Sequence, residues 1–478
     1  MRWTRAALIA AGTALGLVGA AFGLRWAFLQ LRRVTLTPTL YRTPPIGPDE
    51  IAPRWRRIIV SDLHLGGGDR LDDFDDDLAF AAFIDTYVGG DQPTELILAG
   101  DTLEFLQVRL PDLDDDEWSD LAAERRIAVI VAAHHLVFAA LSRFIAGPDR
   151  QLTVMIGNHD FELHYPTAKA RFAAAVGLTF DDPRLRFGVS YHGGGVYLVH
   201  GNQFDGWNRF VYFDGISEPF EVVRGTQLVK EVINDLEDDT LQIAPLIDNV
   251  KPTSAFFWYL LALPRLRNKS SRLFFLRGVT GFLQVVAWPT PHQMPITGRG
   301  PGGPLSAPIF RGLWAWVAIL RRQRVARQRR LARHVSAVAG DLPPPDQVID
   351  QVQSEAARQI RREMRTFNDE YARQMLRIAR QPDHHDDRIF VCGHTHQALV
   401  VPLGAGQTYV NTGTWTEIIY DVAAMIRQEQ RFPFLEITYP EGDAPAASLL
   451  VWLGADEPPQ PWQAGPKLER RRGKIRLQ

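Results

Sequence analysis

Residues 57–65 read RIIVSDLHL, a short apolar run that ends directly in an aspartate and a histidine. A run of four to eight apolar residues with polar boundaries is typical of a buried strand. Four later runs have the same form: ELILAGD (95–101), LTVMIGN (152–158), VYLVHG (196–201) and RIFVCG (388–393). Helix-like sequence at 117–146 separates two of them. This alternation predicts an α/β fold whose strands deliver polar residues to one edge of a buried sheet.

The residues that follow these runs are potential metal ligands or catalytic groups. The blocks are SDLHL with Asp62 and His64, GDTLEF with Asp101, GNHDF with Asn158, His159 and Asp160, VHGN with His200, and CGHTH with His394 and His396. A single Asp or His is more often a surface or capping residue, but five such blocks at predicted strand ends are more specific. Carboxylate, imidazole and amide oxygen together suit divalent metals such as Mn, Fe or Zn.

The order of the blocks resembles that of the calcineurin-like metallophosphoesterase superfamily, whose pattern is D-x-H, G-D, G-N-H-D/E, G-H and G-H-x-H. The fourth block departs from the pattern, since it reads HGN at 200–202. The resemblance implies a four-layer αββα sandwich that holds two divalent metal ions. It also implies the ligands: Asp62, His64 and His396 for one metal, Asn158, His200 and His394 for the other, and Asp101 bridging both.

The implied reaction is hydrolysis of a phosphate ester or pyrophosphate by a hydroxide that bridges the two metals. His159 follows a ligand directly, so we expect it to contact the substrate as a catalytic residue, oriented by Asp160. No covalent nucleophile is needed, and Cys392 is therefore expected to be buried packing. Three polar residues after the fourth block are candidate substrate contacts: Asn202, Asp205 and Asn208.

Composition excludes several other classes of protein. With 46% hydrophobic residues, the 478-residue chain can fill a sizeable core, which excludes a disordered protein. Lys and Arg number 53 against 55 Asp and Glu, so no overall basic field points to nucleic acid as a partner. The single cysteine excludes an internal disulfide framework.

The N-terminus carries 19 uncharged residues at 6–24, close to the ~20 that span a bilayer. This favours a single-pass membrane anchor within 1–36, with a cleaved signal peptide as the alternative. The arginines after the segment favour a cytoplasmic catalytic domain over an exported one. The Pro-rich stretch at 37–54 is predicted to be an extended linker.

The remaining sequence divides into two halves of one core, at 55–205 and 388–457, around a helical insertion or lid at 206–387, with a basic tail at 458–478. The insertion holds aromatic, apolar segments and seven arginines between Arg321 and Arg333. This composition fits contact with a membrane surface, and an ordinary helical insertion with a solvated basic face is the alternative.

The substrate is the least determined property. GDTLEF and GNHDF, followed by a helical insertion, look similar to the UDP-diacylglucosamine pyrophosphohydrolase branch, although that branch has GNRDF, so His159 is a departure. A lipid-linked phosphate ester at the membrane is therefore expected. The alternatives are a soluble nucleotide, a phosphoprotein, or a metal-binding pseudoenzyme or scaffold.

Other titratable groups are predicted to lie outside the site. His134 is expected to be packing in a helix. For the acidic run DDFDDD (72–77) two interpretations stay open, a loose attraction for metal and simple solvent exposure. His384 and Asp387 are expected in a solvated loop before a strand.

Overall fold

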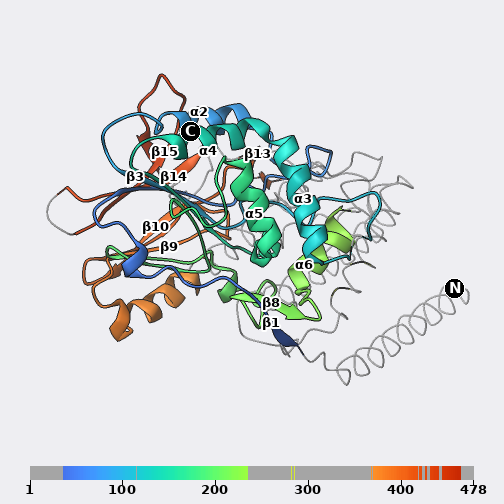
Figure 1. The fold of residues 1–478 in the computed structure, drawn as a ribbon. Coiled ribbons are helices and arrows are strands. Elements are labelled where there is room, and N and C mark those ends of the chain that lie inside the picture. Colours follow the sequence, from blue (N-terminus) through green and yellow to red (C-terminus); the bar gives the residue numbers. More distant parts are fainter. Residues whose placement is uncertain are drawn as a thin grey trace, which may run out of the picture.

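A computed structural model describes residues 36–114, 116–234, 370–417, 431–440 and 444–463, with a few isolated positions between them. These residues form a mixed α/β structure (Figure 1), so the predicted α/β class is confirmed. The predicted membrane anchor, most of the helical insertion at 206–387 and most of the basic tail lie outside the described residues.

The larger sheet has seven strands in the order β16-β15-β14-β2-β3-β4-β5. Its strands are β2 (Arg56–Val60), β3 (Thr94–Ala99), β4 (Arg150–Met155), β5 (Leu185–Gly188), β14 (Pro433–Thr438), β15 (Ala446–Val451) and β16 (Gln460–Pro461). Strands β2 to β5 are parallel to one another, and β14 joins β2 in antiparallel pairing. The first three predicted runs are thus adjacent strands of this sheet, as β2, β3 and β4.

The smaller sheet has five strands in the order β10-β11-β9-β7-β6. Its strands are β6 (Tyr191–Gly193), β7 (Val196–Leu198), β9 (Ile389–Cys392), β10 (Leu399–Gly404) and β11 (Gln407–Asn411). The strand after the insertion, β9, lies between β7 and β11 and is parallel to both. The two halves of the chain therefore combine in a single sheet.

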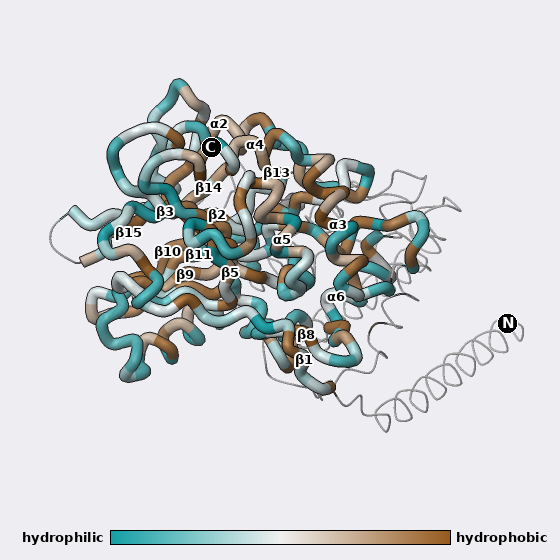
Figure 2. Tube along the Cα trace, viewed as in Figure 1, coloured by the Kyte–Doolittle hydropathy of each residue, from teal (hydrophilic) through white to brown (hydrophobic). Residues whose placement is uncertain are grey.

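Alternation along β2 explains how the layers pack, since successive strand residues point to opposite faces. Ile58 and Val60 join a core with the helices, whereas Ile59 joins a core with the smaller sheet. The helices on this outer side are α2 (Asp77–Asp85), α3 (Asp120–Ala133), α4 (His135–Ala146) and α5 (Pro166–Ala175). Hydrophobic segments run through the strands and these helices, and hydrophilic ones through many of the connecting loops (Figure 2).

A helical segment at 370–379 covers the far face of the smaller sheet and lies on the opposite side of the molecule from α2 and α4 (Figure 1). Its Tyr371 and Met375 pack with Phe390 and Cys392 of β9. Burial raises the pKa of the Cys392 thiol well above its usual range. Cys392 is a packing residue, as predicted.

The predicted linker and the predicted tail both contain strands. In the predicted linker, β1 (Thr37–Arg42) pairs with β8 (Gly215–Glu218), and Ile46 and Ile51 are buried between the two sheets. This segment is therefore part of the folded unit. In the predicted tail, β16 pairs with β15. The other short elements are η1 (Pro48–Glu50), η2 (Phe161–His164), η3 (Asn202–Phe204), α6 (Arg224–Leu228), η4 (Val229–Ile233), η6 (Pro382–His384), β12 (Ile419–Asp421) and β13 (Ile426–Arg427).

Within the described ranges, no single helix has the length and apolar composition needed to cross a membrane. In this part of the chain, α3 and α4 meet the length and composition criteria only when they are taken together. The break between them bends the pair by 91°.

Candidate metal centre

The candidate ligands lie just beyond the carboxyl ends of strands from both sheets. Asp62 follows β2, Asp101 follows β3, His200 follows β7 and His394 follows β9. Backbone hydrogen bonds join these loops, for example from Asp62 N to Gly100 O at 3.0 Å. The amide of His394 also donates to the Asp62 carboxylate at 3.0 Å. The first and last sequence blocks are therefore in direct contact.

Five of the predicted ligands have left-handed backbone conformations, which cost roughly 1–3 kcal/mol each for non-glycine residues. Their φ angles are 53° for Asp62, 52° for His64, 48° for Asp101, 66° for His394 and 59° for His396. Such conformations persist only where the surrounding structure enforces them, and they cluster at functional sites. The loops are shaped to bring these side chains together, at a cost in local stability.

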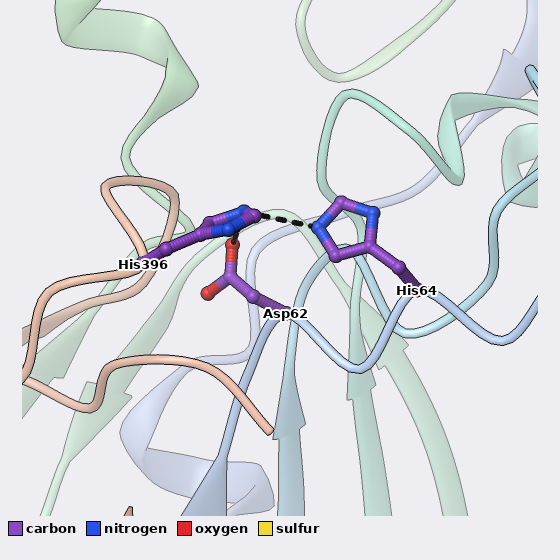
Figure 3. Close-up of side chains that lie close together, drawn as sticks. All are labelled: Asp62, His64 and His396. Atoms are coloured by element: carbon purple, nitrogen blue, oxygen red, sulfur yellow. Dashed lines mark hydrogen bonds and ion pairs between the residues drawn. The ribbon is translucent and has the colours of Figure 1, made fainter. Parts of the chain in front are cut away.

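The first predicted ligand set forms one compact group (Figure 3). Nε2 of His396 lies 3.4 Å from Oδ1 of Asp62 and 3.1 Å from Nε2 of His64. All three residues are buried, and one ligand atom of each lies within 4.8 Å of the others. Asp62, His64 and His396 are thus positioned to hold a metal ion.

Asp101, His200 and His394 form a second group of the same size. Nε2 of His200 is 2.9 Å from Oδ2 of Asp101, and its Nδ1 is 3.0 Å from the Ala99 carbonyl. The neighbouring loop is held on the same carboxylate, because His159 N donates to Oδ1 of Asp101 at 2.8 Å. Of the predicted second set, His200 and His394 are therefore grouped around Asp101.

The buried polar atoms at the site that make no hydrogen bond to another described residue include two on predicted ligands of the second metal. They are Oδ1 of Asn158 and Nδ1 of His394. Buried polar groups without a partner are costly, and each of these atoms carries a lone pair that a cation can accept. Both residues belong to the predicted second ligand set, so the donors present fit a metal ion.

The electrostatics of the centre also favour a cation. Burial raises the pKa of Asp62, and the negative charge of Asp101 adds to that rise. Burial acts on Asp101 in the same direction, but His200 and His159 outweigh it and hold the pKa of Asp101 well below its usual range. Burial lowers the pKa of His200, but the charge of Asp101 outweighs this effect and raises the pKa to about 10. Positive charge beside these buried carboxylates therefore stabilises their ionised form.

Glu104 is a residue of the site that sequence reasoning missed. Its buried carboxylate lies 2.8 Å from Nδ1 of His64 and also contacts Nδ1 of His159. Burial opposes ionisation, yet His159 more than compensates and lowers the pKa of Glu104. A carboxylate on the far nitrogen of a ligating histidine fixes its tautomer and orientation. The available signal was its place in GDTLEF, three residues after Asp101.

Asp160, predicted to orient His159, binds backbone amides in the structure. Its carboxylate accepts hydrogen bonds from Gly157 N at 2.6 Å and Thr102 N at 2.8 Å, so it joins the loops after β4 and β3. Burial, together with the charge of Asp101, raises the pKa of Asp160 to about 7. Both carboxylate oxygens are occupied by backbone amides, and Glu104 contacts the His159 ring instead.

Of the three candidate substrate contacts, Asp205 touches a predicted metal ligand. Its Oδ2 lies 3.2 Å from Nε2 of His394 and accepts a hydrogen bond from Nδ2 of Asn208 at 2.7 Å. Asn202 donates to the backbone of Asn208 at 3.2 Å. These residues tie the start of the insertion to the centre.

Two glycines allow the loops to approach this closely. A Cβ atom on Gly157 would lie 2.2 Å from Oδ1 of Asp101, and one on Gly393 would lie 2.4 Å from Oδ2 of Asp62. Both distances are shorter than real Cβ contacts, so the G-N-H-D and G-H-T-H blocks need glycine for steric reasons.

The expectations for His134 and the acidic run are corrected by the structure. His134 is buried, with Nε2 at 2.9 Å from Asp72 and Nδ1 at 3.0 Å from Asp77. Burial lowers its pKa, but the two carboxylates outweigh this and raise the pKa to about 9. Asp72 also accepts a hydrogen bond from Gly68 N at 2.7 Å, just beyond the SDLHL block. His134 therefore forms ion pairs with Asp72 and Asp77, and these two residues of the acidic run help to hold the fold together.

A scan against protein-family models and a search of curated proteins gave no match to this chain. The chemistry of the centre therefore follows from its own residues and geometry.

Proposed function

We propose that the protein is a metal-dependent phosphoesterase related to the calcineurin-like metallophosphoesterases. The observation that carries this is the contact between His64 and His396, which are 332 residues apart in the chain yet lie 3.1 Å apart beside Asp62. The packing order of helices, sheet, sheet and helix agrees with the sandwich expected of that superfamily.

Two divalent ions, of Mn, Fe or Zn, would be shared among the ligands. Asp62, His64 and His396 would hold one, and Asn158, His200 and His394 the other, with Asp101 between them. When bound, such a pair activates water and neutralises the phosphoryl oxygens. The complete donor set favours an enzyme over a pseudoenzyme or scaffold.

His159 is the proposed proton donor to the leaving group. Its Nδ1 contacts Glu104, which holds the ring beside the ligand group. The side chain is 18% exposed, against 7% for that of His64. A histidine held by a carboxylate and open to solvent can act as a general acid. Asp160 supports the surrounding loops.

We infer a phosphate ester or pyrophosphate as substrate, and a lipid-linked one is proposed from the apolar segment at 6–24 and the aromatic insertion. The apolar segment also supports a membrane-anchored protein, and the arginines that follow it support a cytoplasmic catalytic domain.

Metal analysis of the purified full-length chain, beside a panel of mono-, di- and pyrophosphate esters, tests the proposal. We expect about two metal equivalents per chain and turnover of at least one ester class. Loss of bound metal with no rate on any ester would favour a scaffold instead. Equal or faster turnover of soluble nucleotides than of detergent-dispersed lipid pyrophosphates would contradict the lipid-linked substrate alone.

A further inference from the structure

A second cluster of metal-type ligands lies at the opposite end of β9 from the candidate metal centre. It consists of His192 on β6, His384 at the end of η6 and Asp387, two residues before β9 begins. The candidate centre lies beyond the carboxyl end of β9, whereas this cluster lies at its amino end. At ~3.3 Å per strand residue, β9 alone separates the two by roughly 10 Å. The cluster is therefore a separate site.

The two histidines converge on a single oxygen atom. Oδ2 of Asp387 lies 2.8 Å from Nδ1 of His384 and 3.0 Å from Nε2 of His192. The two imidazole rings have centroids 4.6 Å apart. Tetrahedral Zn²⁺ has ligands at about 2.0–2.2 Å, which places neighbouring ligand atoms roughly 3.3 Å apart. The two distances from Oδ2 are within about half an ångström of that value, and one ligand atom of each of the three residues lies within 4.8 Å of the others.

The charge of Asp387 gives a reason for a cation at this place. Its side chain is only 5% exposed, and an isolated buried carboxylate is strongly unfavourable. Within the described part of the chain, its ion pairs are with the two histidines and with no lysine or arginine. A divalent cation would neutralise the carboxylate without requiring either imidazole to be protonated.

The surroundings hold the ligands in place on one side and leave access on the other. Gln407 donates from Nε2 to the Asp387 carbonyl at 3.0 Å, and the Tyr197 ring packs against His384 at 4.4 Å between centroids. The His192 side chain is 35% exposed, so solvent reaches this side of the cluster. A bound ion could complete its coordination there with water.

We propose that His192, His384 and Asp387 form a peripheral Zn²⁺ site with three protein ligands and one open position. Binding requires a lone pair on each coordinating nitrogen, so it selects the tautomers with hydrogen on Nδ1 of His192 and Nε2 of His384. The ion cross-links β6 to the segment in which the chain returns from the insertion to the core. It therefore stabilises the junction between the two halves of the smaller sheet.

The test compares His192→Ala with His385→Ala in the full-length protein. His385 is the matched control because it is next to His384 but its side chain is 89% exposed and lies outside the cluster. Chelator-treated protein is titrated with Zn²⁺, dialysed and analysed for bound zinc, with melting temperature as a second readout. We expect His192→Ala to hold one equivalent fewer than both the wild type and His385→Ala, and to be stabilised less by zinc.

Repeating the comparison in an Asp62→Asn background separates this site from the candidate centre. The difference of one zinc equivalent should persist in that background. In the otherwise wild-type protein, His192→Ala should keep phosphoesterase turnover within about twofold of wild type. Asp387→Asn, which retains the shape of the side chain, should lose the same equivalent. Equal zinc content in His192→Ala, Asp387→Asn and the wild type would overturn the proposal, and so would a difference that disappears in the Asp62→Asn background.

Discussion

Oδ2 of Asp205 lies 3.2 Å from Nε2 of His394, and both side chains are buried. A carboxylate at this nitrogen keeps the imidazole hydrogen on Nε2, which leaves Nδ1 as the ligand atom. Nδ1 of His394 is buried without a hydrogen-bond partner among the described residues, in agreement with that role. Asp205, which directly follows η3, is thus a positioning residue for the centre.

Replacing Asp205 with alanine should weaken metal binding about 10- to 100-fold, because the His394 ring loses the partner that sets its tautomer. Calorimetric titration of metal-depleted protein measures this. Asp205→Asn should recover part of the affinity, since its amide oxygen can still accept the hydrogen bond. Asp214→Asn is a control on a half-exposed carboxylate nearby in sequence. Unchanged affinity in Asp205→Ala would show that His394 needs no such partner.

Asp101→Asn and His159→Ala should separate metal binding from chemistry. Asp101 is buried within the ligand group, so Asp101→Asn should remove at least one metal equivalent and most turnover. His159→Ala should retain metal and lose turnover by about 10²- to 10⁴-fold, as expected for a general acid. Elemental analysis beside steady-state kinetics distinguishes them. Full activity in Asp101→Asn would contradict its proposed place between the metals.

Glu104→Gln should lower both metal affinity and turnover, because the same carboxylate contacts His64 and His159. We expect a loss of about tenfold or more in affinity, the range typical of partners that orient metal-bound histidines. Metal titration and kinetics on one preparation test it. Normal metal binding with reduced turnover would assign Glu104 to His159 alone.

Gly157→Ala should damage both the fold and the centre, since its methyl group would fall 2.2 Å from Oδ1 of Asp101. Overpacking of this kind costs about 1–3 kcal/mol. Gly89→Ala is the matched control because a Cβ there meets nothing within 4 Å. Denaturant unfolding and metal content are the measurements. Equal stability of the two variants would mean that the loops after β3 and β4 can separate freely.

The stability of the protein should depend on pH through the ion pairs of His134 with Asp72 and Asp77. The pKa of His134 is raised from 6.5 to about 9, so the stabilisation is fully present below pH 6.5 and is lost as the pH rises through about 9. The upper limit is on the order of 3 kcal/mol. The difference in unfolding free energy between wild type and His134→Gln should shrink across this range. His135→Gln, at the exposed neighbouring position, should show no such trend.

The strands and the ligand group could be predicted from sequence because they follow local rules. A short apolar run such as RIIVSD forms a buried strand, and the residue after it must lie at the carboxyl edge of the sheet. Asp62, Asp101 and His200 were identified in this way, and the structure brings them together with the last block.

The contacts that were not predicted depend on which loops approach each other in space. Glu104 and Asp160 each lie in a recognised block, but only the tertiary structure shows which histidine or amide each carboxylate meets. The ion pairs of His134 likewise join a helix to an acidic segment 57 and 62 residues away. Neither periodicity nor local spacing carries that information.

The position of β9 between β7 and β11 has a consequence for biosynthesis. Until the ribosome has translated β9 (Ile389–Cys392), β7 lacks its parallel neighbour, and β2 lacks β14 until residue 438 has been translated. At 5–20 residues per second, the roughly 180 residues of the insertion take about 10–40 s to translate. For at least that time, the nascent first half has unpaired sheet edges and an incomplete ligand set.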